Sequence, residues 1–292
     1  MESNTADKDI GRYIAGSAES YLAPDGKRLS VINLKTAASI ANSQGISAKE
    51  VEITALKQGI VPRRYLRNIG TIGLVGQIKL LQSIVAVVGA GGLGGTIIEL
   101  LARQGIGHLI IVDDDRFTEQ NLNRQIMSTE GNLGKYKVNV AARRVGKINS
   151  ATTVTTFRER LTEENAQKLL GGAQVVADGL DNLPSRLVVE QACRQLAIPY
   201  VYASIAGFSG QLMTIFPEDV GLSSLYESSS DTMPEQGIET KIGNPPATPA
   251  IIAALQVQEV VKIITGVGTP IRNQILLVDA RECVIDRIEL RR

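Results

Sequence analysis

The sequence predicts an α/β protein with a doubly wound, mostly parallel sheet. Short apolar runs alternate with helical patterns from Ser83 onward, and glycine-containing turns separate them. Strands that alternate with helices are typical of parallel sheets whose crossover helices cover both faces. A more polar leader precedes this region, and the composition changes at about residue 60. We therefore predict a helical N-terminal extension over residues 1–60 and a main domain over residues 61–292, whose sheet ends in a C-terminal antiparallel extension.

The composition is that of an ordinary globular chain. Its 292 residues are 43% apolar, and 31 basic against 30 acidic side chains give a net charge of +1. That balance produces no field that would gather nucleic acid or an anionic membrane. No segment has the ~18 uninterrupted apolar residues of a membrane span. The two cysteines, Cys193 and Cys283, and the single histidine, His108, lack zinc-site spacing. We expect a cytoplasmic protein without zinc that binds neither membrane nor nucleic acid.

The leader contains two predicted helices, over residues 35–43 and 48–57. They flank the turn Gln44-Gly45-Ile46, and Ser47 is a candidate N-cap of the second helix. This outline resembles a helix-turn-helix, but the basic face that DNA binding requires is not apparent. We expect a helical pair that packs on the main domain. It could cover the site, extend a dimer interface or recognise a partner.

The elements of the main domain follow in order from Ile84. Apolar runs predict strands over residues 84–88, 108–112, 153–157, 174–177, 200–203 and 211–216, and closing strands over 274–278 and 284–290. Helices are predicted to begin at Gly94, Lys135, Glu163 and Ser185, and at Thr248-Pro249 before an apolar stretch that ends at Gly266. Residues 219–247 form a polar connection whose length suggests a functional loop.

A glycine-rich turn follows the first of these strands. Gly89, Gly91, Gly92 and Gly94 provide the pattern Gly-x-Gly-x-x-Gly between an apolar strand and a helix. Glycine permits a tight turn and close approach of a phosphate, which free N–H groups and the positive helix end stabilise. Asp113, at the tip of the next strand, can accept hydrogen bonds from ribose hydroxyls. The pattern predicts a Rossmann-like fold with an adenosine nucleotide, either NAD or ATP. The alternative is that the glycines serve helix packing alone.

Charged residues farther along the chain favour phosphoryl chemistry. Displacement at phosphorus concentrates negative charge on oxygens, whereas hydride transfer needs little cationic help. Arg124 could bind phosphate oxygens with its planar fork, and Lys137 offers a point charge. Asp181 lies just beyond a strand end and could hold Mg²⁺ that bridges the phosphates. Taken singly, the two cations could be surface charges and Asp181 a helix cap.

Together these motifs resemble the MoeB/ThiF/HesA family, bacterial relatives of ubiquitin-activating enzymes. The resemblance spans about residues 64–290 and rests on the glycine turn, Asp113-x-Asp115, Asn121-x-x-Arg124-Gln125, Gly134-x-x-Lys137, Asp178-x-x-Asp181-Asn182 and the helix over residues 256–262. It implies ATP-dependent adenylylation of the C-terminal Gly-Gly carboxylate of a ubiquitin-like sulfur-carrier protein of the ThiS or MoaD type, with release of pyrophosphate.

The resemblance also assigns roles to these residues. It implies that the glycine turn, Asp113 and Asp115 hold the nucleotide, with Asn121 and Gln125 in the same shell. Arg124 and Lys137 would bind phosphates, and Asp181 would coordinate Mg²⁺.

A family motif near the N-terminus implies a homodimer. Arg64-Tyr65-Leu66-Arg67 matches a motif whose last arginine reaches the partner subunit's site. Arg67 is therefore the candidate for a catalytic residue supplied in trans.

The chain departs from the family pattern at its cysteines. Many members bind zinc through two Cys-x-x-Cys pairs, and others use a crossover-loop cysteine to bond the carrier. This chain has neither, because its two cysteines, Cys193 and Cys283, form no Cys-x-x-Cys pair and residues 219–247 contain none. We expect packing or the leader to replace the rigidity that zinc supplies, and the reaction to stop at the acyl-adenylate. Cys193 is predicted to be an inert buried residue and Cys283 a structural one.

Three other functions remain open. An NAD-dependent oxidoreductase would use the same glycine turn, but the chain has no Tyr-x-x-x-Lys, and His108 begins a strand at the end away from the expected site. An ATP-dependent dehydratase that acts on a modified nucleoside in tRNA belongs to the same family, and the near-neutral charge argues mildly against it. A nucleotide-sensing protein would not need Arg67, Arg124, Lys137 and Asp181 together. The sequence does not identify the carrier or its pathway, whether thiamine, molybdopterin, tungstopterin or amino-acid synthesis.

Overall fold

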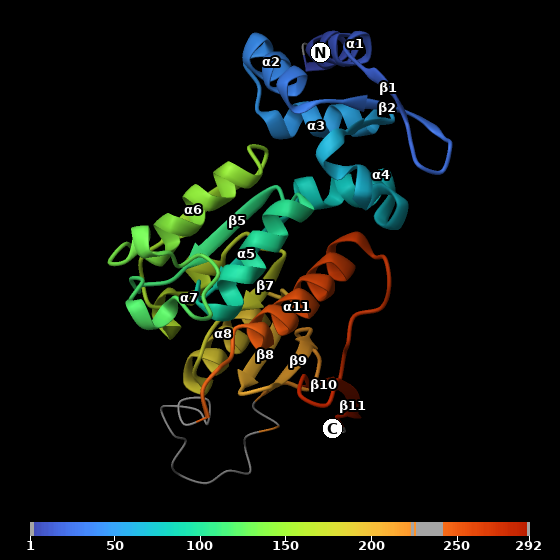
Figure 1. The fold of residues 1–292 in the computed structure, drawn as a ribbon. Helices are drawn as coiled ribbons and strands as arrows, with labels where there is room; N and C mark the ends of the chain where they lie inside the picture. Colours follow the sequence, from blue (N-terminus) through green and yellow to red (C-terminus); the bar gives the residue numbers. More distant parts are fainter. Residues whose placement is uncertain (1–2, 223–224, 226–241, 291–292) are drawn as a thin grey trace.

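Figure 1 shows the computed structural model, which describes residues 3–222, 225 and 242–290. Its N-terminal unit combines helices with a small sheet. The elements are α1 (Ser3–Gly16), β1 (Glu19–Leu22), β2 (Arg28–Ile32), α2 (Leu34–Gln44), α3 (Ala48–Lys57) and β3 (Ile60–Pro62). The helices expected over residues 35–43 and 48–57 are confirmed, whereas the three-stranded sheet, ordered β1-β2-β3, was not predicted. β3 carries this unit slightly past the expected boundary at residue 60, which itself stays a prediction.

Local capping sets the two predicted leader helices. Gly45 ends α2 in the left-handed conformation, with φ of 65°. The N-cap expected at Ser47 is present, because its Oγ accepts a hydrogen bond from the Glu50 backbone N–H at 3.2 Å. The Glu50 carboxylate accepts in return from the Ser47 backbone N–H at 2.8 Å, which completes a capping box.

The leader is fixed to the amino ends of the main sheet. Lys49 Nζ donates to the carbonyl of Gly107, the residue before β5, at 3.3 Å. The buried Glu52 carboxylate pairs with Arg64 Nε at 3.1 Å. Arg64 also donates to Asn149, which follows helix α6. The leader therefore packs at the amino ends of the strands. The predicted site lies at the opposite, carboxyl ends.

The main sheet has eight strands in the order β11-β10-β9-β8-β7-β4-β5-β6. Five are parallel: β4 (Ile84–Val88), β5 (His108–Val112), β6 (Thr153–Phe157), β7 (Val175–Asp178) and β8 (Tyr200–Ala206). The chain runs from β4 outward through β5 to β6 and then returns to place β7 on the other side of β4. This reversal creates a topological switch point at β4, where open α/β sheets bind ligands.

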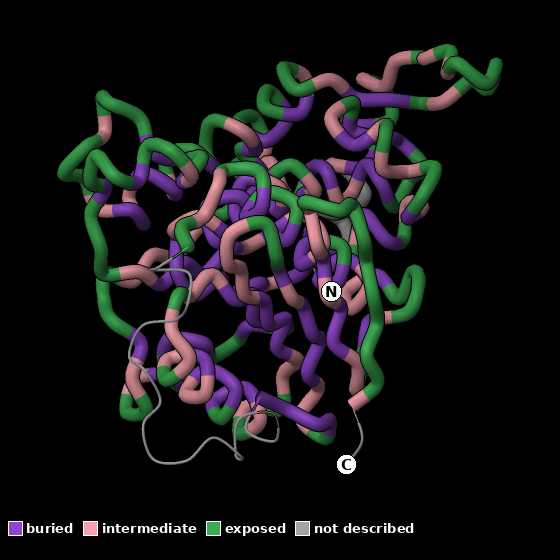
Figure 2. Tube along the Cα trace, turned by 60° about the horizontal axis from the view of Figure 1, so that its bottom comes forward, coloured by how far each residue is buried: buried purple, intermediate pink, exposed green. Residues whose placement is uncertain are grey.

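Helices cover both faces of this sheet, as a doubly wound fold requires (Figure 1). One face packs against α4 (Leu66–Gln82), α5 (Gly92–Gln104), α6 (Lys137–Ile148) and α11 (Ala247–Thr265). The other packs against α7 (Glu163–Leu170) and α8 (Leu183–Gln195). Alternate strand residues enter the two cores, so β4, β5 and β7 are buried except for the first residues of β4 and β5. Buried segments fill the interior of the protein in Figure 2. The predicted doubly wound fold is confirmed.

Helix α11 has the length and hydropathy of a membrane span, alone among the helices of the described ranges. Half of it is buried in the protein. It packs on α5 and on β8 of the sheet. These contacts are those of a core helix in a globular domain.

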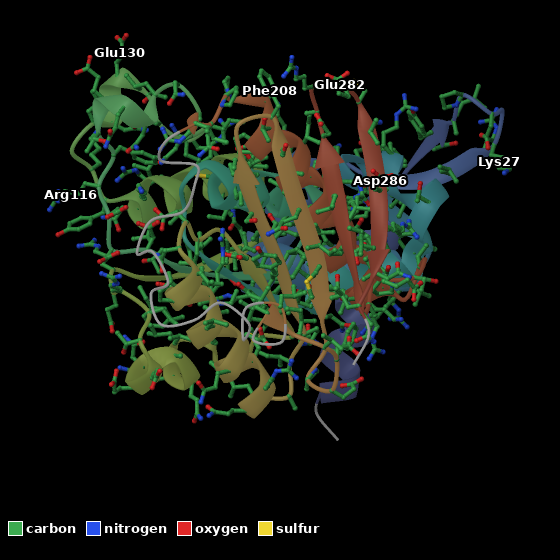
Figure 3. All side chains as sticks on the ribbon, turned by 90° about the horizontal axis from the view of Figure 1, so that it is seen from below. Lys27, Arg116, Glu130, Phe208, Glu282 and Asp286 are labelled. Carbon is green, nitrogen blue, oxygen red and sulfur yellow. The ribbon has the colours of Figure 1, made fainter. Side chains whose placement is uncertain are left out.

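The C-terminal antiparallel extension is also confirmed. β9 (Ser209–Ile215), β10 (Gln274–Asp279) and β11 (Val284–Glu289) continue the sheet from β8 in antiparallel pairs. The turn at Phe208 and the turn at Glu282 lie at the same end of this extension (Figure 3), and the Ala280 N–H donates to the Phe208 carbonyl at 2.9 Å. Most of the connection expected over residues 219–247 lies outside the described residues.

Candidate active site

A cavity of about 740 Å³ opens at the carboxyl ends of β4, β5 and β7, a volume typical of ligand sites. Its lining comes from the turn after β4, the long loop after β5 and the loop after β7. The predicted site residues that line it are Gly89, Gly91, Gly92, Asp113, Asp115, Arg124, Gln125, Lys137 and Asp181. The fold thus brings together residues that span more than ninety positions of the sequence. Gly94, Asn121 and Arg67 do not line it.

Three glycines let two loops touch beneath the cavity. Gly89 has a φ of 91°, and a Cβ on Gly89 or Gly94 would overlap the backbone of Gly179 or Gly89 respectively. A Cβ on Gly179 would lie 2.5 Å from the Gly89 carbonyl oxygen and 2.9 Å from the Gly94 Cα. Gly94 therefore serves close packing rather than ligand contact. Gly179 was missed, because nothing in its local sequence shows that its loop meets the turn after β4.

Asp113 joins the glycine turn to the end of β5. Its Oδ2 accepts from the Ala90 backbone N–H at 2.7 Å, and its Oδ1 accepts from the Asp115 backbone N–H at 2.8 Å. Burial raises the pKa of Asp113, and the charge of Lys137 opposes that rise. Each carboxylate oxygen has a further lone pair, so both remain able to accept from ribose hydroxyls.

Lys137 is held in place as a buried cation. Its Nζ lies 2.8 Å from Asp115 Oδ2, and its side chain is 7% exposed against 66% for Asp115. It is the first residue of α6, two positions after the predicted start. Arg116 stacks 3.7 Å from the centre of the Tyr136 ring, which fixes the backbone immediately before Lys137. Because the Lys137 side chain is already fixed, its ammonium group can bind an anion without a further loss of side-chain entropy.

Asn121 supports the cavity from beneath. Its Oδ1 accepts from the Thr118 backbone N–H at 2.9 Å, and its carbonyl accepts from the Gln125 N–H at 2.9 Å. These bonds shape the short turn that presents Arg124 and Gln125 to the cavity. Arg124 Nη1 donates to the Gln120 carbonyl at 2.9 Å. The buried Gln125 Oε1 has no hydrogen-bond partner among the described residues.

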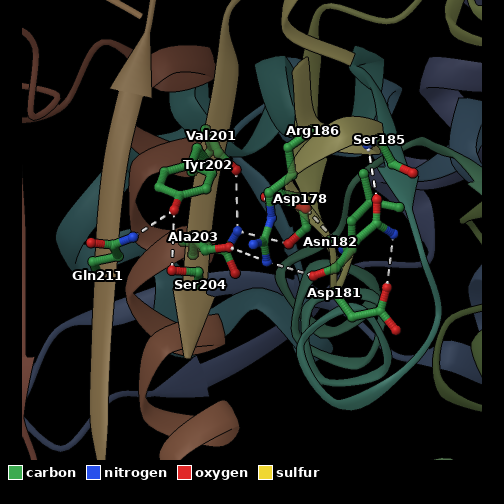
Figure 4. Close-up of polar contacts among 12 residues, drawn as sticks. Asp178, Asp181, Asn182, Ser185, Arg186, Val201, Tyr202, Ala203, Ser204 and Gln211 are labelled. Carbon is green, nitrogen blue, oxygen red and sulfur yellow. Dashed lines mark hydrogen bonds and ion pairs between the residues drawn. The ribbon is translucent and has the colours of Figure 1, made fainter. Parts of the chain in front are cut away.

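The loop after β7 is held by a buried ion pair (Figure 4). Asp178 is fully buried, and its Oδ2 accepts from Arg186 Nε at 3.0 Å. Arg186 Nη2 donates to the carbonyls of Leu180 at 2.7 Å and Ala203 at 3.1 Å. Burial raises the pKa of Asp178, and the Arg186 charge opposes that rise. Arg186 lines the cavity and was not predicted, since its role depends on contacts with two other strands.

Asp181 lies exposed at the mouth of the cavity. Its Oδ1 accepts from Asn182 Nδ2 at 3.1 Å, while Asn182 Oδ1 caps α8 by accepting from the Ser185 backbone N–H at 2.9 Å. The cap is therefore Asn182, and Asp181 is left available for a ligand. Mg²⁺ is usually held by one or two carboxylates together with substrate phosphates, so this single exposed carboxylate fits that ion.

Arg67 lies on the exposed surface of α4, outside the cavity of its own chain. That position is compatible with a contact to a second subunit, and the predicted role in trans stays a prediction.

The two cysteines and the histidine lie apart from the cavity lining. Cys193 is buried, and burial raises the pKa of its thiol, in keeping with the predicted inert residue. Cys283 is exposed in the turn between β10 and β11, with φ of 55°. His108 begins β5 at the opposite edge from the cavity, and its ring bonds the hydroxyls of Thr153 and Thr155. Within residues 3–222, 225 and 242–290, no three His, Cys, Asp or Glu side chains form a metal-binding group.

Ion pairs fix the chain where the 219–247 connection begins. Asp219 Oδ1 lies 2.7 Å from Arg272 Nη2. The Asp219 carbonyl accepts from Arg194 Nη2 at 2.9 Å, and Glu190 accepts from the Leu222 N–H at 2.7 Å. Burial by itself would raise the pKa of Asp219, but hydrogen bonds from Arg272 and from the backbone hold it below its usual value. These contacts join the start of the connection to α8 and to Arg272.

Comparison with known proteins gives a consistent result. The chain matches the ThiF family over residues 65–292. The SAMP-activating enzyme E1 of Haloferax volcanii is 32% identical over 196 residues, which are 66% of this chain and 72% of that protein. The sulfur carrier protein ThiS adenylyltransferase of Escherichia coli is 34% identical over 194 residues, or 66% and 76% of the two chains.

Solved structures share the fold. The structure of Escherichia coli MccB with ATP superposes with a TM-score of 0.67 at 22% identity and covers 88% of this chain and 82% of its own. The structure of MccB with MccA-N7isoASN gives a TM-score of 0.69 at 23% identity, covering 78% and 72%.

Proposed function

The chain belongs to the ThiF family, and from this premise we propose that it uses ATP to adenylylate the C-terminal carboxylate of a ubiquitin-like sulfur-carrier protein. One observation carries the proposal: a single cavity unites the glycine turn after β4, the cations Arg124 and Lys137, and the exposed carboxylate of Asp181. The names of the relatives from Haloferax volcanii and Escherichia coli support a carrier protein as substrate.

The turn after β4 would bind the nucleotide phosphates. Gly91 and Gly92 line the cavity at the N-terminus of α5, where free N–H groups and the helix dipole favour an anion. Asp113 would accept from the ribose hydroxyls. Arg124 and Lys137 approach from the loop after β5 and would neutralise the charge that develops on the pyrophosphate.

The reaction needs no covalent intermediate on the protein. A carboxylate oxygen of the carrier attacks the α-phosphorus, and the bond to the pyrophosphate oxygen breaks, which yields an acyl-adenylate and pyrophosphate. The protein must hold two anions in line and offset their repulsion. Mg²⁺ held by Asp181 would add positive charge at the phosphates. Because residues 219–247 contain no cysteine, the product on this chain is the acyl-adenylate itself.

We further propose a cytoplasmic homodimer. Arg67 lies outside the cavity of its own chain, so a phosphate contact by Arg67 would require a second subunit. The carrier would be of the ThiS or MoaD type, and neither a membrane nor a nucleic acid is part of the proposed reaction.

ATP–pyrophosphate exchange in the presence of Mg²⁺ tests the activity. Purified ThiS- and MoaD-type carriers that end in Gly-Gly would each be compared with a form lacking those two glycines. We expect exchange with an intact carrier and none with its truncated form. Binding of ATP without exchange for any carrier would contradict the proposal and favour action on tRNA or nucleotide sensing.

A further inference from the structure

We propose that Arg186 binds the attacking carboxylate of the substrate and orients it toward the α-phosphorus. This assignment rests on the proposed adenylylation. It adds a substrate-binding residue on the side of the cavity opposite to Lys137.

Arg186 is a buried guanidinium with donors to spare. Its side chain is 10% exposed, and the residue lines the cavity. Nε donates to Asp178, and Nη2 donates to the carbonyls of Leu180 and Ala203 (Figure 4). Nη1 has no acceptor among the residues that the structure describes. The three bonds that are made fix the plane of the guanidinium and therefore the direction of the remaining N–H groups.

The position of Arg186 carries two electrostatic costs, which its pairing offsets. It lies in the first turn of α8, where the helix dipole disfavours a cation. Burial of a charged group is also unfavourable unless the charge is paired, and Asp178 provides that pairing. An apolar residue here would leave the buried Asp178 carboxylate and the carbonyls of Leu180 and Ala203 without this donor. These bonds use Nε and Nη2, and the remaining Nη1 donor suits a carboxylate ligand, which a planar guanidinium binds well.

The strand order places Arg186 where an attacking group must be. Lys137 reaches the cavity from the β5 side, where it pairs with Asp115, whereas Arg186 is bonded to residues of β7 and β8 on the other side of β4. In-line displacement at phosphorus requires the attacking and leaving oxygens to lie on opposite sides of the reacting atom. If the pyrophosphate leaves toward Lys137, the carboxylate arrives from the side of Arg186.

The test compares binding of two forms of one carrier, in the presence of an α,β-methylene ATP analogue that cannot release pyrophosphate. The carrier is the one that supports exchange, prepared with its natural C-terminal carboxylate and with a C-terminal amide. Calorimetry would be done on the wild type, on Arg186→Lys and on the control Arg144→Lys. Arg144 forms a two-bond pair with Glu99 on the helical layer and does not line the cavity.

We expect the wild type and Arg144→Lys to prefer the carboxylate. Arg186→Lys should lose that preference by ~10- to 100-fold, the range for a lost hydrogen bond between charged groups. A purely structural role would weaken both carrier forms and the nucleotide alike. An unchanged preference in Arg186→Lys would overturn the assignment, as would a loss confined to nucleotide affinity. Absence of exchange with every carrier would instead refute the proposed function on which the assignment depends.

Discussion

Replacement of Asp181 by Asn should remove most of the turnover and leave the fold nearly as stable as before. Asp181 is exposed, and its carboxylate makes one hydrogen bond, to Asn182 Nδ2 at 3.1 Å. Surface substitutions of this kind change the free energy of unfolding by about 0.5 kcal/mol or less. The loss of one charge-stabilising group in an anionic transition state costs ~3 kcal/mol, or about a hundredfold in rate.

Asp178→Asn is the matched comparison, three positions earlier in the same loop. Asp178 is fully buried and paired with Arg186 at 3.0 Å. Loss of one partner of a buried ion pair costs ~3–5 kcal/mol of unfolding free energy, because the other charge stays buried without compensation. The two substitutions have the same chemistry, so any difference between them comes from their surroundings.

Denaturant unfolding and pyrophosphate exchange, measured on both variants, separate the two effects. The expected result is a large loss of exchange with a small change in midpoint for Asp181→Asn, and a large shift in midpoint for Asp178→Asn. Equal losses of stability and exchange in Asp181→Asn would refute the role of this residue in Mg²⁺ binding. An Asp178→Asn variant as stable as the wild type would contradict the expectation that this buried ion pair stabilises the fold.

Three further substitutions test other parts of the structure. Gly179→Ala should destabilise the protein by more than the ~1–3 kcal/mol of ordinary overpacking and should weaken ATP binding, because the new Cβ would overlap backbone atoms that cannot move away. The control Gly131→Ala places its Cβ in open space and should change neither the unfolding free energy nor ATP binding. Inactive Arg67→Ala and Arg124→Ala subunits should partly recover exchange when mixed, and no recovery would argue against an arginine in trans. The pKa of Asp219 is lower in the folded than in the unfolded protein, so its ionised carboxylate stabilises the fold above the unfolded pKa of about 4, and this contribution is lost as the pH falls through the folded pKa. Asp219→Asn should therefore be less stable than wild type at pH 7, and the difference between their unfolding curves should shrink below about pH 4.

The strands of the main sheet were predictable because their signal is local. β4 and β5 are apolar runs followed by a turn, and a fully buried parallel strand needs no partner to be recognised by that pattern. The leader strands were missed for the opposite reason. β1 reads Glu-Ser-Tyr-Leu and is half exposed, so its pairing with β2 is decided by the neighbouring strand and not by its own residues.

Within the site, the sequence specified the residues that follow each strand. Parallel strands bring their carboxyl ends to one edge, so the glycine turn, Asp113 and Asp181 had to meet once the strands were recognised. The same reasoning placed Asn121 and Gly94 in that region without showing that one builds a turn and the other permits close packing. That distinction depends on the hydrogen bonds of Asn121 and the close backbone contacts of Gly94 in the folded chain.

The sequence by itself determined the fold class, the edge of the sheet that carries the site and the chemistry of most groups there, since these follow from short-range patterns and from strand direction. Only the tertiary structure decided that Gly179 lets two loops touch and that Arg186 forms a buried pair with Asp178 beside the cavity. It also decided that the leader packs at the far edge of the sheet. The physical reason is that each of these features is a contact between segments far apart in the chain, and its free energy depends on burial and partner atoms that exist only after folding.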